Sequence, residues 1–229
     1  MNLVALIMAA GSGSRFDAGM PKQTTTLSGR AMLAHSAEVL AASPRVSGLI
    51  LVAPAGQEAT FTALLAEEAA RKLRAAVAGS ATRQDSVYNG LERVPEGATH
   101  VLIHDAARPC LSAALRDRVI DALATHDAVV PAVPVTDTLI RDMDAGVDAI
   151  LDRVNIAGVQ TPQGFRLDLI RRAHRIARER GFKSSDDGSL VLALGEKVAT
   201  VPGERTNLKV TFRDDVIVAE AILKNGGAA

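Results

Sequence analysis

The feature that most constrains the fold is an alternation between short apolar runs and segments with helical spacing. The apolar runs have strand length and are apolar at consecutive positions, not at every second one. Such strands are typical of a parallel sheet that helices cover on both faces. The runs are residues 3–10, 48–53, 75–78, 100–104 and 128–134. We therefore predict an α/β fold with one doubly wound, mostly parallel sheet.

Between these runs, apolar residues recur at intervals of three and four, the spacing of a helix that buries one face. Leu33, Ala37 and Leu40 show it in the first such segment. The pattern predicts helices at 31–42, 58–73, 111–125, 168–180, 185–194 and 213–223, a further strand at 197–201 and an extended segment at 207–210. A chain of 229 residues suits one domain, which we expect to span residues 1–229.

The alternation stops after Pro134. Residues 135–156, here called the arm, contain two short extended pieces, 137–141 and 149–154, around a charged turn. This pattern predicts an inserted β-hairpin. The arm is too polar for a core of its own, so we expect it either to be a solvated flap or to pack on another surface.

Composition excludes several classes of protein. The 26 Lys and Arg residues balance 26 Asp and Glu residues, and the aromatic residues are five Phe and one Tyr, which argues against nucleic-acid binding. The apolar runs are far shorter than the roughly 20 residues that span a bilayer. No secretory pattern precedes the first run, and the lone Cys110 cannot form an internal disulfide. We expect a soluble protein of the cytoplasm.

The first predicted strand leads into a glycine-rich loop, residues 9–15, and then into Pro21-Lys22-Gln23. Glycines at the carboxyl edge of a parallel sheet let backbone N–H groups approach a phosphate. A dinucleotide fingerprint would need glycine where Phe16 stands, and a Walker A loop would need Gly-Lys-Ser/Thr around Lys22. A loop with two cations, Arg15 and Lys22, remains, and it suits a triphosphate. The plainer alternative is a tight turn with two solvated basic residues.

A second cluster follows the strand predicted at 100–104. Asp105 would lie in the same crevice as the glycine loop, where a carboxylate and phosphate oxygens can hold Mg²⁺. Arg108 could then face an acidic substrate. The alternative is that Asp105 caps a turn or helix with Arg108 as its partner. We interpret His104 as a structural residue and not as a base.

Together these segments resemble the 2-C-methyl-D-erythritol 4-phosphate cytidylyltransferase family of nucleotidyltransferases. Further matching segments are Arg83-Gln84-Asp85-Ser86-Val87, Asp137-Thr138, Gln160-Thr161-Pro162-Gln163 and Asn207-Leu208-Lys209-Val210-Thr211. The resemblance covers nearly the whole chain and implies a Rossmann-like nucleotidyltransferase fold. It also implies transfer of CMP from CTP to 2-C-methyl-D-erythritol 4-phosphate, with release of pyrophosphate, in non-mevalonate isoprenoid biosynthesis.

The resemblance assigns roles to individual residues. The catalytic cations would be Arg15, Lys22, Arg153 and Lys209. CTP would be bound by Ala9, Ala10, Gly11, Ser12, Gly13, Ser80, Ala81, Arg83 and Ser86. Methylerythritol phosphate would be bound by Arg108, Thr138, Arg153, Thr161 and Lys209. Asp105 would bind Mg²⁺, and the arm would join two subunits of a homodimer so that Thr138 and Arg153 enter the neighbouring subunit's site.

Two alternatives stay open. A related enzyme could act on another polyol phosphate, such as ribitol 5-phosphate. The chain could also be a catalytically silent nucleotide-binding or scaffold protein. Against that alternative, such a protein would have no reason to keep all five charged residues Arg15, Lys22, Asp105, Arg153 and Lys209.

Two segments depart from the family pattern: Thr24-Thr25-Thr26 replaces an aromatic residue before Leu27, and Gly188 replaces an alanine. The glycine weakens a helix start by less than about 1 kcal/mol.

Overall fold

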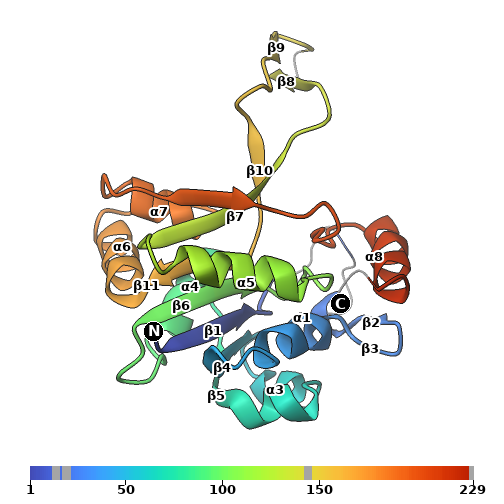
Figure 1. Cartoon of the computed structure of the whole chain (residues 1–229), viewed down its shortest axis with the longest axis vertical. Coiled ribbons are helices and arrows are strands. Elements are labelled where there is room, and N and C mark those ends of the chain that lie inside the picture. The colour runs from blue at the N-terminus through green and yellow to red at the C-terminus, as the bar shows by residue number, and fades with distance from the viewer. Residues whose placement is uncertain (12–15, 17–21, 142–145, 227–229) are drawn as a thin grey trace.

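The computed structural model describes residues 1–11, 16, 22–141 and 146–226. Its central sheet consists of β1 (Leu3–Met8), β4 (Val46–Ala53), β5 (Leu73–Ala78), β6 (His100–Asp105), β7 (Ala128–Pro134), β10 (Ala157–Val159), β11 (Gln163–Arg166) and β12 (Ala199–Pro202). The strand order is β10-β7-β11-β6-β1-β4-β5, and β12 pairs with β7 (Figure 1). Among these strands, β10 and β11 run antiparallel to their neighbours. The predicted mostly parallel α/β sheet is confirmed.

The helices are α1 (Met32–Ala41), α2 (Glu58–Thr62), α3 (Glu67–Lys72), α4 (Arg83–Leu91), α5 (Ala113–Ala122), α6 (Leu167–Glu179), α7 (Asp187–Leu192) and α8 (Asp214–Lys224). A 3-10 turn, η1 (Lys22–Thr24), precedes a small ladder of β2 (Thr26–Leu27) and β3 (Arg30–Ala31). Among the described residues, no helix is both long enough and apolar enough to cross a membrane.

The prediction of one helix over residues 58–73 is wrong. The segment forms α2 and α3, and Leu73 already belongs to β5. Phe61, Leu65 and Ala69 are nevertheless buried in one cluster, because two short helices can present the same apolar spacing as one long helix. The elements η1, β2, β3, α4, β10 and β11 were not predicted, and the predicted extended segment 207–210 has no strand partner among the described residues.

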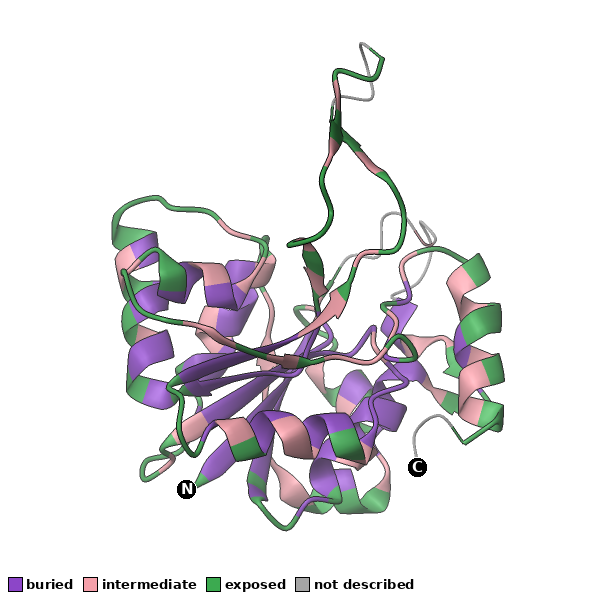
Figure 2. Cartoon of the chain, turned by 45° about the horizontal axis from the view of Figure 1, so that its top comes forward, coloured by how far each residue is buried: buried purple, intermediate pink, exposed green. Residues whose placement is uncertain are grey.

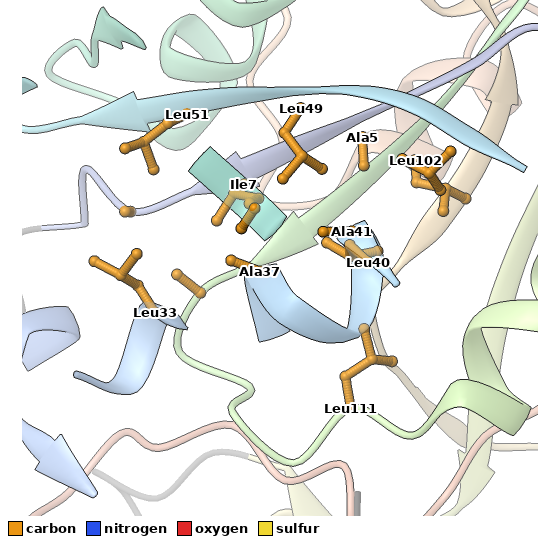
Figure 3. Packing of buried hydrophobic residues seen from close by; sticks show 14 of the residues in the cluster. Ala5, Ile7, Leu33, Ala37, Leu40, Ala41, Leu49, Leu51, Leu102 and Leu111 are labelled. Atoms are coloured by element: carbon orange, nitrogen blue, oxygen red, sulfur yellow. The ribbon is translucent and has the colours of Figure 1, made fainter. Parts of the chain in front are cut away.

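Burial on both faces explains why the strands are apolar throughout. Leu3, Ala5 and Ile7 of β1 point to one face and belong to one buried cluster with residues of α1, β4 and α5. Figure 3 shows Ala5 and Ile7 among residues of α1 and β4. Val4 and Leu6 point to the opposite face, among residues of α4, α6 and α7. Since successive side chains of a strand alternate between faces, a sheet covered on both sides needs apolar residues at every position. Figure 2 shows the resulting buried centre.

The loops after β1, β5 and β6 meet at the carboxyl edge of the sheet. Main-chain hydrogen bonds continue past the strands: Ala9 N donates to Val52 O at 2.8 Å, and Ala106 N to Met8 O at 3.0 Å. A Cβ added to Gly79 would lie 2.2 Å from the Cβ of Ala10, so only glycine allows this approach. The close packing fixes the loops that carry the candidate site.

The arm extends away from the sheet (Figure 1). It contains one antiparallel ladder of β8 (Leu139–Arg141) and β9 (Ala149–Leu151), which confirms the predicted hairpin but with shorter strands. Asp142 and Asp144 of its expected turn lie outside the described residues. Ile150 of the arm is 71% exposed and Val154 81% exposed. The arm therefore presents apolar side chains that the described part of its own chain does not cover.

Candidate active site

A cavity of about 460 Å³ opens at the carboxyl edge of the sheet. Its walls come from the end of β1, η1, the start of α4, the end of β6 and the segment after β12. We call it the first cavity. Most of the residues predicted to bind CTP or act in catalysis line it: Ala10, Gly11, Lys22, Ser80, Ala81, Arg83, Ser86, Asp105 and Lys209.

A second cavity, also of about 460 Å³, adjoins the first. Arg83, Asp105 and Lys209 line both, so the two cavities meet at these three charged side chains. Of the residues predicted to bind the sugar phosphate, Arg108, Thr161 and Lys209 lie here. Other residues of its lining include Gln160, Gln163, Ser185, Asp186 and Gly188.

Asp105 lies at the centre of this arrangement. Its Oδ1 is 3.0 Å from Arg83 Nε and its Oδ2 is 2.7 Å from Lys209 Nζ. Burial by itself would raise the pKa of Asp105, but the positive charges of Arg83 and Lys209 outweigh that effect and hold the pKa below its ordinary value. The carboxylate is therefore ionised at neutral pH and faces both cavities.

The alternative, a turn at Asp105 with Arg108 as its partner, holds for the backbone, where Arg108 N donates to Asp105 O at 2.9 Å. The carboxylate of Asp105, however, pairs with Arg83 and Lys209. Arg108 instead donates from Nη1 to Asn207 O at 2.8 Å and from Nη2 to Val159 O at 3.3 Å. Burial lowers the pKa of Arg108 from its ordinary value, but an arginine stays positive at neutral pH. The second cavity thus contains a cation held by backbone carbonyls.

Arg83 is positioned by the start of α4. Thr82 caps this helix, since its side chain accepts a hydrogen bond from Asp85 N at 3.0 Å. Ser86, one turn into the helix, accepts from Ser80 N at 2.9 Å and donates to Thr82 O at 2.8 Å. These contacts tie the loop after β5 to the helix. They place Ser80 and Arg83 on the wall of the first cavity.

His104 has a structural position. His104 Nε2 lies 3.2 Å from Arg108 O, and because a carbonyl can only accept, Nε2 is the donor. Nδ1 of the neutral ring therefore accepts from the Thr161 hydroxyl at 3.1 Å, and Thr161 Oγ1 in turn accepts from Asp105 N at 3.1 Å. Burial lowers the pKa of His104 to about 4. The neutral ring therefore links three site residues, as expected for a structural histidine.

Lys22 and Gln23 join the glycine loop to the segment after β12. Lys22 is 8% exposed, and its Nζ donates to Val210 O at 2.8 Å. Gln23 Nε2 donates to Gly11 O at 3.2 Å, which holds the described start of the loop. Val210 N donates to Ala107 O at 2.8 Å. The ammonium of Lys22 therefore reaches the first cavity from a fixed position.

Several predicted residues lie elsewhere. Ser12, Gly13 and Arg15 fall outside the described residues. Ala9 is fully buried beneath the loop and does not line either cavity. Thr138 and Arg153 are exposed on the arm, where Arg153 Nη1 donates to Thr136 O, and neither lines the first or the second cavity.

The structure also adds residues that the sequence analysis did not single out. Gln23, Gln160 and Asn207 belong to the matching segments, and all three are buried. Each donates a hydrogen bond to the backbone of a loop at the site. Their presence in the matching segments was the sequence signal that could have identified them. Asp187 and His174 form a buried pair behind Arg83. Asp187 lies in the segment 185–189, which was compared with the family pattern, but nothing in the sequence indicated its pairing with His174.

The lining can contribute to a divalent cation site. No cluster of three or more His, Cys, Asp and Glu side chains able to hold a metal occurs in the described part of the chain. Mg²⁺ is often held by one or two carboxylates together with substrate phosphate oxygens, so a single ionised carboxylate in a phosphate-binding cavity fits it. Asp105 is that carboxylate.

Comparison with known proteins gives one family. The family model described as IspD, 2-C-methyl-D-erythritol 4-phosphate cytidylyltransferase, matches residues 3–225. The cytidylyltransferase of that name from Geobacillus kaustophilus is 38% identical over 223 residues, 97% of each chain. A bifunctional enzyme IspD/IspF from Anaeromyxobacter dehalogenans is 44% identical over 97% of this chain and 57% of that protein. The crystal structure of the cytidylyltransferase from Thermus thermophilus is similar with a TM-score of 0.81, at 33% identity over 96% of this chain and 98% of that one.

Proposed function

Because the chain belongs to the 2-C-methyl-D-erythritol 4-phosphate cytidylyltransferase family, we propose that its two adjoining cavities hold the two substrates of that reaction. The protein is a nucleotidyltransferase that transfers the cytidylyl group of CTP to 2-C-methyl-D-erythritol 4-phosphate in non-mevalonate isoprenoid biosynthesis. The proposal concerns which residues act in each step.

The observation that supports the assignment is the wall common to the two cavities. Arg83, Asp105 and Lys209 line both, so two phosphorylated molecules bound there would meet at these charges. CTP suits the first cavity, where Ala10, Gly11 and Lys22 can hold a triphosphate and Ser80 can hydrogen-bond the base. Methylerythritol phosphate suits the second, where Arg108 and Thr161 supply a cation and a hydroxyl.

The reaction needs positioning and charge stabilisation more than proton transfer. A phosphate oxygen of methylerythritol phosphate attacks the α-phosphorus of CTP, and the bond to pyrophosphate breaks. The attacking oxygen is already ionised at neutral pH, so no base is required, in agreement with a neutral, buried His104. Arg15 and Lys22 stabilise the charge that develops at the α-phosphate, and Lys209 and Arg153 position the attacking phosphate.

Family members generally use a divalent cation. We propose Mg²⁺, with Asp105 as its protein ligand and phosphate oxygens of CTP as the others. When bound, the cation would neutralise charge on the triphosphate. Arg83 and Lys209, the present partners of Asp105, keep that carboxylate ionised before substrates arrive.

We propose a homodimer joined through the arm. Its exposed apolar residues, Ile150 and Val154 among them, suit burial against a second copy. Thr138 and Arg153, which do not line the first or the second cavity of their own chain, would then reach the neighbouring site. We propose the cytoplasm as the location, because the lone Cys110 cannot form an internal disulfide.

The experiment that tests the function is turnover of CTP with 2-C-methyl-D-erythritol 4-phosphate and, in parallel, with ribitol 5-phosphate, following pyrophosphate release. We expect kcat/KM to favour the methylerythritol phosphate. A preference for ribitol 5-phosphate would instead assign the second cavity to another polyol phosphate.

Mixing variants tests the shared site. Neither an Arg15→Ala nor an Arg153→Ala homodimer should be fully active. In their heterodimer one site carries both substitutions and the other carries none, so activity should recover toward half of the unsubstituted value. Purified heterodimers without any recovery would show that Arg153 serves its own subunit or none.

A further inference from the structure

Two buried ionisable residues lie behind the active site and have no role in the reaction described above. Asp187 is the first residue of α7, and His174 belongs to α6. Their side chains are 1% and 0% exposed. Asp187 Oδ2 lies 2.7 Å from Arg83 Nη1, and Asp187 Oδ1 lies 3.0 Å from His174 Nε2. The carboxylate of Asp187 thus joins His174 to the guanidinium that also contacts Asp105.

The hydrogen-bond roles follow from the charges. Burial alone would raise the pKa of Asp187, but Arg83 and His174 outweigh burial and lower it. An ionised carboxylate can only accept, so His174 donates to it from Nε2. Nδ1 of His174 is buried and has no hydrogen-bond partner among the residues that the structure describes. Asp187 is therefore the group that orients the imidazole ring.

Packing alone gives no reason for a carboxylate at this position. Burying an ion pair costs desolvation, and well-packed apolar residues can join two helices equally well. The neighbouring residues Leu190 and Val191 of α7 are already packed in a core cluster with Ile170 of α6. What a carboxylate adds, and an apolar side chain cannot, is a defined orientation for Arg83.

That orientation matters for Asp105. An arginine beside a carboxylate commonly forms a two-pronged pair that occupies both oxygens. Arg83 instead approaches Oδ1 of Asp105 through Nε, while its Nη1 is turned toward Asp187. Oδ2 is left to Lys209, whose side chain is 40% exposed and can be drawn away by an arriving phosphate.

We propose that Asp187, held by His174, is a positioning residue for cytidylyl transfer, which keeps Arg83 from occupying both oxygens of Asp105 and so leaves that carboxylate available to the divalent cation. The inference rests on the proposed role of Asp105 as cation ligand. Without the Asp187 charge, Arg83 would turn to Asp105 and compete with the cation.

The surrounding backbone is fixed by other contacts. Gln84 Nε2 donates to Phe182 O at 3.1 Å, and Gln84 Oε1 accepts from Ser184 N at 3.0 Å. Asp186 caps α7 by accepting from Ser189 N at 3.1 Å. Loss of the Asp187 charge is therefore expected to free the Arg83 side chain more than to displace α4 or α7.

The test is Asp187→Asn, which keeps the shape and removes the charge. With saturating CTP and methylerythritol phosphate, the Mg²⁺ concentration for half-maximal activity should rise roughly tenfold, as substitutions behind metal ligands commonly do. Binding of Mn²⁺ in the presence of a non-hydrolysable CTP analogue, followed by electron paramagnetic resonance, should weaken to a similar extent. At saturating cation, kcat should fall much less. Asp187→Glu, which keeps the charge, should restore most of the affinity.

A second pair keeps the proposal testable if Asp187 variants do not fold. His174→Gln retains a donor near the Nε2 position and should keep cation affinity close to that of the parent. His174→Leu removes the donor, packs in an apolar site, and should weaken cation binding. If folded Asp187→Asn or His174→Leu protein binds Mn²⁺ as the parent does, the positioning role is wrong.

Two controls separate the possible failures. Glu196→Gln breaks the ion pair with Arg172, which joins the loop after α7 to α6 on the outside of the molecule, and should leave cation dependence unchanged. Asp105→Asn tests the ligand itself. Unchanged Mn²⁺ binding in that variant would overturn the proposed cation site, whereas a loss in Asp105→Asn without any effect of Asp187→Asn would overturn the positioning role alone.

Discussion

The active-site crevice, formed by the first and second cavities, differs from the arm in how its side chains are stabilised. In the crevice, the charges are paired within one chain: Asp105 contacts Arg83 and Lys209, and Arg83 contacts Asp187. In the arm, a single short ladder leaves Ile150 and Val154 exposed to solvent. Figure 2 shows the contrast between the buried sheet and the exposed arm.

The two regions differ in whether a single chain is enough to stabilise them. The ion pairs of the crevice need no other molecule, because each buried carboxylate named above already has a cationic partner. A two-stranded hairpin, by contrast, is marginal in water when it has nothing to pack against. We infer that the crevice is prepared by the fold of one chain, and that the arm is completed by a second copy.

The largest expected effect is on catalysis. Arg15→Ala or Lys22→Ala should lower kcat by roughly 100-fold or more, because each would remove a cation that we propose acts most strongly on the transition state. The dissociation constant of CTP, measured by calorimetry, should change much less. Arg175→Ala, which breaks an exposed pair with Glu179 on α6, is the matched control and should have the kinetics of the parent. Equal losses of CTP binding and rate would show that the cations stabilise the ground state.

The next effect is on the pH dependence of stability. The folded-state pKa of His104 is about 4 and its ordinary value is 6.5, so the unfolded chain takes up a proton first. The free energy of unfolding contributed by the neutral ring is complete above pH 6.5 and is lost as the pH falls toward 4. The loss amounts to about 3 kcal/mol. Urea unfolding of the parent and of His104→Gln between about pH 7 and pH 4.5 measures it. Parallel curves for the two proteins would contradict the buried neutral ring.

A charge placed in the arm should separate assembly from folding. Ile150→Asp is expected to give monomers in analytical ultracentrifugation, with a melting temperature of the monomer fold close to that of the parent. Activity should fall about tenfold, because in the proposed dimer Thr138 and Arg153 act in the neighbouring site. Val218→Asp, at a 51% exposed position of α8, is the control. A dimer that survives Ile150→Asp but dissociates with Val218→Asp would move the interface to α8.

The smallest expected effect is on stability alone, at the N-terminal cap of α5. Ser112 caps α5 by accepting a hydrogen bond from Leu115 N at 2.9 Å. Ser112→Ala should lower the free energy of unfolding by about 1 kcal/mol without changing kcat or the oligomeric state. Ser112→Thr, which keeps the hydroxyl, should recover the stability. A change in kcat would mean that α5 influences the crevice.

Sequence patterns predicted those elements in which local and tertiary demands agree. The strand predicted at 128–134 is found as Ala128–Pro134, since its consecutive apolar residues have no other stable environment than a buried sheet. Helix α4 was missed because Val87 and Leu91 are its only large buried apolar residues, and its start is set by the Thr82 cap. The break between α2 and α3 was missed because the apolar spacing continues across it.

The candidate site likewise contains residues whose positions could be predicted and contacts that could not. Ala10, Gly11, Lys22 and Asp105 follow strand ends or a recognisable loop, so their convergence at one edge of a parallel sheet could be predicted. The ion-pair partners of the Asp105 carboxylate could not be predicted. The sequence offered Arg108 as a turn partner, and the backbone forms that turn, but the carboxylate pairs with Arg83 and Lys209, which are distant in the chain.

The sequence by itself determined the doubly covered sheet, the glycine loop at its edge and the family, because burial on both faces and close approach to phosphate restrict residue type locally. Only the tertiary structure decided which charges meet. Arg83 and Asp187 are 104 positions apart in the chain, as are Asp105 and Lys209. Electrostatic pairing depends on distance through space, and no local pattern records it.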